Sequence, residues 1–242
     1  MIFISLPFVN QKYMTHKNIV FVLMIIMAIC LVVGSCRNTS GPPVQETTPP
    51  MEEPVVKTDS TWLFNGVSLD GWEITNFGPQ GPVSVSGGQI ILGMGDGCTG
   101  ITWKRYFPDM NYKVSLEAKR VAGNDFFCGM TFPVGKESCS LIIGGWAGTT
   151  VGLSSINKKD ASENQTTSYK LFERNRWYHI GLIVKKDTIQ AFIDDEMVVN
   201  YVRSENDVLS VRPEVELSKP FGIASWYTTA ALKNIRVTEI ND

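Results

Sequence analysis

The sequence predicts an all-β fold, a sandwich of two antiparallel sheets, and three observations support this prediction. The stretch Arg176–Val202 alternates apolar and polar residues in three segments, which the polar turns 185–187 and 194–196 separate. Alternation with a period of two is typical of half-buried strands, so this stretch is predicted to be a three-stranded meander with one apolar side to bury. Similar segments recur from residue 61 to residue 240, and helix signals are nearly absent. This pattern favours two sheets packed face to face.

The expected strands follow one another with turn signals between them. Before the meander they are Val83–Ser86, Gln89–Leu92, Gly100–Trp103, Tyr112–Arg120, Phe126–Phe132, Cys139–Ile143 and Thr150–Leu153, and after it Phe221–Trp226 and Ala231–Ile240. Only residues 204–218 are a candidate for a turn or two of helix, and Pro213 interrupts them. No repeat of propeller length is visible, so residues 61–242 are expected to form one two-sheet domain.

The first 36 residues are predicted to be a signal peptide outside this domain. Lys12 and Lys17 precede an apolar run, Ile19–Val33, which is shorter than the roughly 20 residues that a spanning helix needs. The run ends in Val33-Gly34-Ser35-Cys36, which resembles the lipobox of bacterial lipoproteins, where the cysteine is acylated after cleavage. The resemblance implies a lipid anchor on Cys36. A plain secretory signal or an uncleaved anchor is the alternative.

The predicted signal peptide also implies a tether after it and a cellular location for the protein. Residues 37–60 are rich in Pro, Thr, Ser and Glu, and we expect them to form a disordered, solvated link between the lipid and the domain. The lipid anchor would place the protein in the bacterial cell envelope, either in the periplasm or exposed on the surface. The membrane is therefore one expected partner.

Charge and motifs narrow the classes of other partners. Without residues 1–36 the chain has 20 basic against 24 acidic side chains, which gives no reason to expect a nucleic-acid partner. Gly95–Gly100 has the spacing GxGxxG, but β-forming residues follow it where a nucleotide site needs a helix. No CxxC pair or histidine cluster suggests a metal site. No cofactor or metal is therefore expected.

Three cysteines remain in the predicted domain: Cys98, Cys128 and Cys139. A simple hairpin would pair Cys128 with Ile142 and Cys139 with Thr131, so these two sulfurs would not face each other. We interpret the three thiols as buried small apolar groups.

Exposed aromatic residues are the candidate sugar contacts. Trp146 lies in Gly144-Gly145-Trp146-Ala147-Gly148, among residues too small to bury it fully, and Trp226 and Tyr227 stand next to each other before two threonines. A flat indole or phenol ring can stack on the apolar face of a sugar. The alternative is that these rings belong to the core.

Three polar strand residues are the candidate catalytic groups. His179 is the only histidine outside the leader, and by alternation it lies on the face opposite to Tyr178 and Ile180. In Tyr112–Arg120, Glu117 and Lys119 share one face and would lie about 7 Å apart along the strand, a suitable width for a sugar. A structural histidine and a solvated strand face explain the same residues.

The beginning and the end of the predicted domain resemble a known family. The residues that carry the resemblance are Leu63-Phe64-Asn65-Gly66, Leu69-Asp70-Gly71-Trp72, Pro220-Phe221-Gly222-Ile223-Ala224 and Leu232-Lys233-Asn234-Ile235-Arg236-Val237. They are similar to the family called DUF1080, the 3-keto-disaccharide hydrolase domain, some members of which have 3-keto-glucoside 1,2-lyase and 3-keto-2-hydroxy-glucal hydratase activities. The resemblance implies a concanavalin A-like jelly roll, a carbohydrate partner and an enzyme of glycoside processing.

The implied chemistry assigns roles to the polar strand residues. A ketone at C3 acidifies the proton on C2, so a base can remove it, the group on C1 leaves by elimination, and water then adds. Such a reaction needs a base, a group that stabilises the enolate oxygen and an acid for the leaving group. Strand parity suggests His179 as base, Lys119 as enolate stabiliser and Glu117 as acid. The alternatives are a carbohydrate-binding module without catalysis and a structural cell-envelope lipoprotein.

Overall fold

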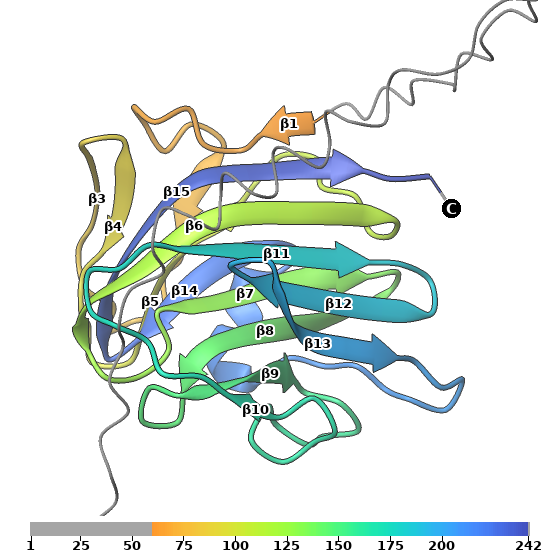
Figure 1. Ribbon diagram of the computed structural model, residues 1–242. Coiled ribbons are helices and arrows are strands. Elements are labelled where there is room, and N and C mark those ends of the chain that lie inside the picture. The colour runs from red at the N-terminus through yellow and green to blue at the C-terminus, as the bar shows by residue number, and fades with distance from the viewer. Residues whose placement is uncertain (1–59, 242) are drawn as a thin grey trace, which may run out of the picture. The chain divides into compact units, whose positions relative to one another are not determined.

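The alternating segments form two antiparallel sheets in the computed structural model, which describes residues 60–241 (Figure 1). The first sheet has the order β13 (Glu196–Val202), β12 (Thr188–Ile193), β11 (Tyr178–Val184), β6 (Tyr112–Gly123), β15 (Thr228–Glu239), β4 (Gln89–Leu92) and β3 (Val83–Ser86), and β1 (Ser60–Trp62) also pairs with β15. The second sheet has the order β10 (Ser168–Tyr169), β9 (Thr150–Ser154), β8 (Glu137–Gly145), β7 (Cys128–Val134), β14 (Gly222–Trp226), β5 (Cys98–Trp103) and β2 (Trp72–Ile74). The predicted all-β sandwich is therefore confirmed.

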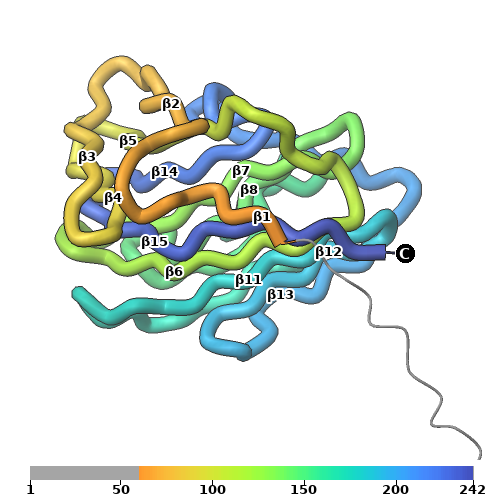
Figure 2. Tube along the Cα trace, turned by 90° about the horizontal axis from the view of Figure 1, so that it is seen from above, coloured from red at the N-terminus to blue at the C-terminus, as the bar shows by residue number. Residues whose placement is uncertain are grey.

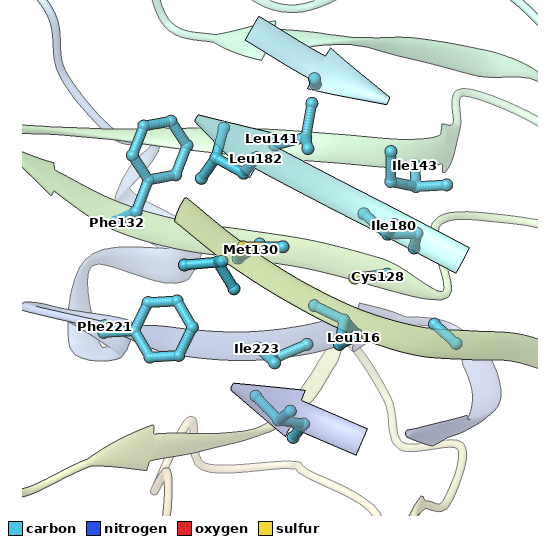
Figure 3. Packing of buried hydrophobic residues seen from close by; sticks show 14 of the residues in the cluster. Leu116, Cys128, Met130, Phe132, Leu141, Ile143, Ile180, Leu182, Phe221 and Ile223 are labelled. Atoms are coloured by element: carbon cyan, nitrogen blue, oxygen red, sulfur yellow. The ribbon is translucent and has the colours of Figure 1, made fainter. Parts of the chain in front are cut away.

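The hydrophobic core lies between the two sheets because alternate side chains of each strand point inward. On β11, Tyr178, Ile180 and Leu182 are buried, whereas His179 is exposed. Figure 3 shows core side chains from both sheets: Leu116, Ile180 and Leu182 from the first, and Cys128, Met130, Phe132, Leu141, Ile143, Phe221 and Ile223 from the second. Burial of each large aliphatic side chain contributes about 1.5–3 kcal/mol. The residues between these positions form the outer faces of the sandwich.

The predicted meander is present as β11, β12 and β13. Strand β11 pairs with β6 in the register that places His179 opposite Glu117 and Tyr178 opposite Ala118. His179 and Glu117 therefore lie on the outer face of the first sheet, while Tyr178 and Ala118 are buried in the core.

The expected register of the β7–β8 hairpin is wrong by one residue. Cys128 pairs with Ile143 and Phe132 with Cys139, because Val134 and Glu137 close a two-residue turn with Gly135 at a φ of 61°. A turn with positive φ at that position suits glycine and matches the twist of the strands. Cys98, Cys128 and Cys139 are free and buried, so the prediction of buried thiols is confirmed.

The opening motif is a turn that fixes the first core residues. The side chain of Asn65 accepts hydrogen bonds from the backbone N–H groups of Val67 and Ser68, both at 2.8 Å. The indole N–H of the buried Trp72 donates to the carbonyl of Leu63 at 2.6 Å. These contacts hold the chain as it passes from the first sheet to the second.

Both ends of the described chain lie at one place in the first sheet. Ser60 pairs with Thr238 and Trp62 with Arg236, so β1 runs beside the last strand (Figure 2). No helix within residues 60–241 is long and apolar enough to cross a membrane. The predictions for residues 1–36 and for the tether up to residue 59 lie outside the described residues.

Candidate functional site

A pocket of about 230 Å³ lies on the outer face of the second sheet. Ser140 and Ile142 of β8 and Ser154 of β9 face it, because Leu141, Ile143 and Leu153 point into the core. We call it the Trp146 pocket, and its lining is Asp125, Phe126, Ser140, Ile142, Trp146, Ser154, Arg212, Glu214, Val215 and Trp226.

One wall of the Trp146 pocket comes from the segment around η1 (Pro213–Ser218), the only helix in the described part of the chain. Val211 and Val215 pack in a small apolar cluster with Cys98 and Ala224, on the outer face of the second sheet. The hydroxyl of Thr102 on β5 donates to the carbonyl of Leu217 at 3.1 Å. This segment therefore covers β5 and β14 and leaves the surface over β8 and β9 open.

The β8–β9 turn presents Trp146 at the rim of the pocket. Trp146 and Ala147 have φ values of 46° and 66°, and Gly144 and Gly148 flank them with φ values of 78° and 96°. Trp146 is 38% exposed, as its glycine-rich surroundings suggest. Its contact with a ligand stays a prediction.

A buried arginine supports this turn from inside the sandwich. Arg120 of β6 is 7% exposed, and its guanidinium donates to the carbonyl of Gly148 at 3.4 Å and to that of Phe172 at 2.8 Å. It also lies over the ring of Phe127, with 5.9 Å between Cζ and the ring centre. Burial lowers the pKa of Arg120, because the charged form loses hydration. The first sheet thus holds the turn that carries Trp146.

The other two predicted sugar contacts are Trp226, which ends β14, and Tyr227, which lies in the turn that follows. Trp226 lines the pocket and stacks on Phe126, with the ring centres 6.4 Å apart. Tyr227 packs edge-on against Trp226 at 5.1 Å, is 44% exposed, and donates its hydroxyl hydrogen to Asp96 at 2.8 Å. Tyr227 does not line the pocket, so any contact with a sugar would be at its margin.

Arg212 is the cation of the Trp146 pocket and is held by two carboxylates. It pairs with Asp160, and with Glu214 through hydrogen bonds of 3.0 and 3.2 Å. Asp160 also accepts a hydrogen bond from Ser155 Oγ at 2.9 Å. The hydrogen bond to Glu214 raises the pKa of Arg212, and the same bond lowers the pKa of Glu214. All of these contacts favour the ionised forms.

Asp125 differs from Glu214, the other carboxylate that lines this pocket. Its Oδ1 accepts a hydrogen bond from the N–H of Phe126 at 2.7 Å, and within residues 60–241 it forms no ion pair. Asp125 is half-buried where β7 begins. It is therefore a pocket-lining carboxylate that can accept a proton from a ligand.

The predicted catalytic residues lie elsewhere, on the outer face of the first sheet. His179 and Glu117 line a pocket of about 200 Å³ there. Glu117 Oε2 is 3.1 Å from Lys233 Nζ, and its Oε1 accepts a hydrogen bond from Asn234 at 2.5 Å. Lys119 is not part of that pocket: its ammonium lies 4.5 Å from the ring centre of Trp177. The structure brings His179 and Glu117 together.

The three predicted catalytic residues and the predicted aromatic contacts are on opposite sides of the sandwich. They therefore do not form one site, and the roles assigned to His179, Glu117 and Lys119 stay predictions. Sequence reasoning missed Asp125, Asp160 and Arg212, which lie in loops, and Glu214 of η1; of these, Arg212 and Asp160 meet across 52 residues of sequence. Among residues 60–241, no three His, Cys, Asp or Glu side chains are grouped so that they could hold a metal ion.

Solved structures of the same β-sandwich type are similar to this chain. A Crh5 transglycosylase bound to NAG is 15% identical, with 76% of this chain and 84% of that chain covered and a TM-score of 0.51. A protein of Parabacteroides distasonis named as a candidate glycosyl hydrolase is 14% identical, with coverages of 75% and 94% and a TM-score of 0.50. A Bacillus subtilis protein of unknown function with a galectin-like fold is 11% identical, with coverages of 70% and 90% and a TM-score of 0.50. The fold is thus a jelly roll.

The family follows from the sequence itself. The chain belongs to the 3-keto-alpha-glucoside-1,2-lyase-like domain family, which it matches over residues 59–238. The resemblance carried by the opening and closing motifs is therefore confirmed. No curated protein sequence matches the chain significantly. Membership of this family associates the chain with glycoside-related, hydrolase- or lyase-like proteins.

Proposed function

We propose that the chain cleaves 3-keto-glucosides in the Trp146 pocket, by elimination at C1–C2 followed by hydration. One observation carries the proposal: the same pocket contains two indole rings, of Trp146 and Trp226, the cation Arg212 and the carboxylate Asp125. Aromatic rings bind the apolar face of a sugar, and the two charged groups match the base and the enolate stabiliser that the reaction needs. Membership of the lyase-like family supports this reading of the site.

Asp125 is proposed as the base. A carboxylate oxygen takes the proton from C2, and the electron pair of the C–H bond moves into an enolate that extends to the oxygen on C3. The enolate then expels the substituent of C1 with the electron pair of the C1–O bond, and the departing oxygen takes the proton that Asp125 removed from C2. A C1–C2 double bond beside the ketone results. Addition of water across this bond yields the free 3-keto sugar. A carboxylate is known to serve as base beside a ketone in other enzymes.

Arg212 is proposed to stabilise the enolate oxygen. The negative charge that develops there is favoured by a fixed positive group in a site sheltered from water. The contacts of Arg212 with Glu214 and Asp160 keep the guanidinium charged and hold it in place. Ser140 and Ser154 offer hydroxyl groups on the pocket floor to the hydroxyls of the sugar.

The test is turnover of a 3-keto-glucoside with a nitrophenyl leaving group and of its unoxidised parent. Wild-type protein should release nitrophenol from the keto sugar only, and Asp125→Asn should lower kcat by about 10²–10⁴, the usual contribution of a general base. His179→Ala, on the opposite face, is the matched control and should keep its activity. Loss of activity in His179→Ala with Asp125→Asn unaffected would refute the proposed site and support the strand residues instead.

Binding without turnover would point to the second reading, a carbohydrate-binding module. The aromatic lining favours that reading as much as it favours catalysis, because stacking needs no acid or base. In that case Trp146→Ala should abolish binding of the sugar while Asp125→Asn should have little effect.

We further propose that a lipid on Cys36 keeps this activity at the bacterial cell envelope.

A further inference from the structure

The outer face of the first sheet carries a second pocket, about 200 Å³ in volume, at a site where the proposed reaction does not take place. We call it the Trp62 pocket. It is lined by Trp62, Ser115, Glu117, His179, Asn234 and Arg236, which come from β1, β6, β11 and β15. From this lining we infer that the face is a second sugar-binding site, specific for a sugar unit that carries a carboxylate.

The wall of the Trp62 pocket offers an aromatic surface. Trp62 is 57% exposed, although it is a large apolar side chain in a strand. The guanidinium of Arg236, the residue that pairs with Trp62 in the ladder, lies 5.7 Å from the centre of its ring. An indole beside an arginine is suited to the apolar face of a sugar with a negative substituent.

Glu117 is already neutralised by its neighbours. One oxygen accepts a hydrogen bond from Asn234, and the other pairs with Lys233. The carboxylate is therefore a fixed acceptor for hydroxyl groups and not a free negative charge. His179, opposite Glu117 in the strand pairing, adds a ring with a donor and an acceptor when neutral.

Arg236 is the group that selects an anion. Its Nε donates to Ser115 Oγ at 3.0 Å, which fixes the side chain against the sheet. Among residues 60–241, no carboxylate pairs with Arg236 or with Lys119. Lys119 and Lys233 do not line the pocket, and Lys233 pairs with Glu117, so Arg236 is the one arginine or lysine of the lining. The fork of a guanidinium matches a carboxylate in two parallel hydrogen bonds.

A sugar explains this lining better than a lipid surface does. Apart from the buried Leu116, the lining consists of polar side chains beside one ring, and Trp62 is the only large apolar side chain among them with an exposed surface. Because the two pockets are on opposite sides of the sandwich, an acidic glycan could stay bound while a neutral glycoside reacts. The binding does not depend on the proposed reaction.

Calorimetry on Asp125→Asn protein separates the two proposals, because the proposed reaction is blocked in this variant. Oligogalacturonate is the acidic probe, and a cello-oligosaccharide of equal length is the neutral one. Oligogalacturonate should bind, and Arg236→Gln and Trp62→Ala should each weaken it at least 10-fold. Lys185→Gln, at an exposed turn of the same sheet, is the matched charge control and should change binding less than twofold.

Each of the following results would contradict the inference. Equal binding of the neutral probe would remove the selection for a carboxylate, and equal weakening by Lys185→Gln would leave only general charge attraction. Binding to phosphatidylglycerol vesicles without binding to either sugar would make the face a lipid contact. No binding of any probe by folded protein would exclude the site, and a urea unfolding curve of each variant verifies the fold.

Discussion

Replacement of the buried Arg120 by methionine should destabilise the domain and loosen the turn that carries Trp146. Methionine keeps much of the apolar stem but removes both hydrogen bonds of the guanidinium. The carbonyls of Gly148 and Phe172 then lose their charged donor inside the sandwich. The change therefore tests whether the first sheet supports the pocket on the second.

The magnitude follows from the two contacts. A hydrogen bond to a charged group contributes about 1.5–3 kcal/mol, and the bond of 3.4 Å to Gly148 belongs at or below the lower end. The bond of 2.8 Å to Phe172 belongs near the upper end. Removal of the buried charge regains part of its desolvation cost. We therefore expect a net loss of about 3 kcal/mol, a large part of the 5–15 kcal/mol typical of a domain.

Urea unfolding followed by tryptophan fluorescence measures the free energy of unfolding. Hydrogen exchange at the amides of Gly148 and Thr149, which donate to the carbonyl of Gly145 at 3.2 Å, reports on the turn and should become faster. Arg174→Met, at an exposed arginine of the loop before β11, is the matched control and should cost less than about 0.5 kcal/mol. A loss below about 1 kcal/mol with unchanged exchange would refute the supporting role of Arg120.

Two further predictions concern the cysteines. Burial raises the pKa of the Cys128 and Cys139 thiols from 9.0 to about 12. The unfolded chain therefore loses these protons first, so the free energy of unfolding should fall between pH 9 and pH 12 by about 1.4 kcal/mol per pH unit per thiol. A Cys128→Ala, Cys139→Ala double variant should show a shallower slope in urea titrations across this range, and an equal slope would contradict the cause. Cells fed labelled palmitate should label the wild-type chain and not Cys36→Ser; an unlabelled wild type would exclude the lipid anchor.

Local patterns were sufficient to predict most of the strands. The hairpin of β3 and β4 was predicted with its observed limits, because Gly87 and Gly88 mark a two-residue turn between alternating segments. The short strands β1, β2 and β10 were missed, since each has at most three residues, too few for alternation to show, and β1 and β2 also depend on distant partners. The register of β7 and β8 depends on how Gly135 turns, which alternation alone does not determine.

The candidate site was less accessible to sequence reasoning. Strand parity placed His179 and Glu117 on one surface, and the glycine-rich turn indicated an exposed Trp146. Parity could not say which outer face carries the larger pocket, because that depends on the segment around η1 folding over the second sheet. Arg212 meets Asp160 across 52 residues of sequence, and no local spacing signals such a contact.

The pairing of β1 with β15 has a consequence for synthesis and folding. Ser60 pairs with Thr238, and β6 has its longest pairing with β15, so the sandwich cannot close until β15 has left the ribosome. Contacts between such distant residues also make folding slow. A nascent chain of this topology therefore stays open until β15 has been synthesised.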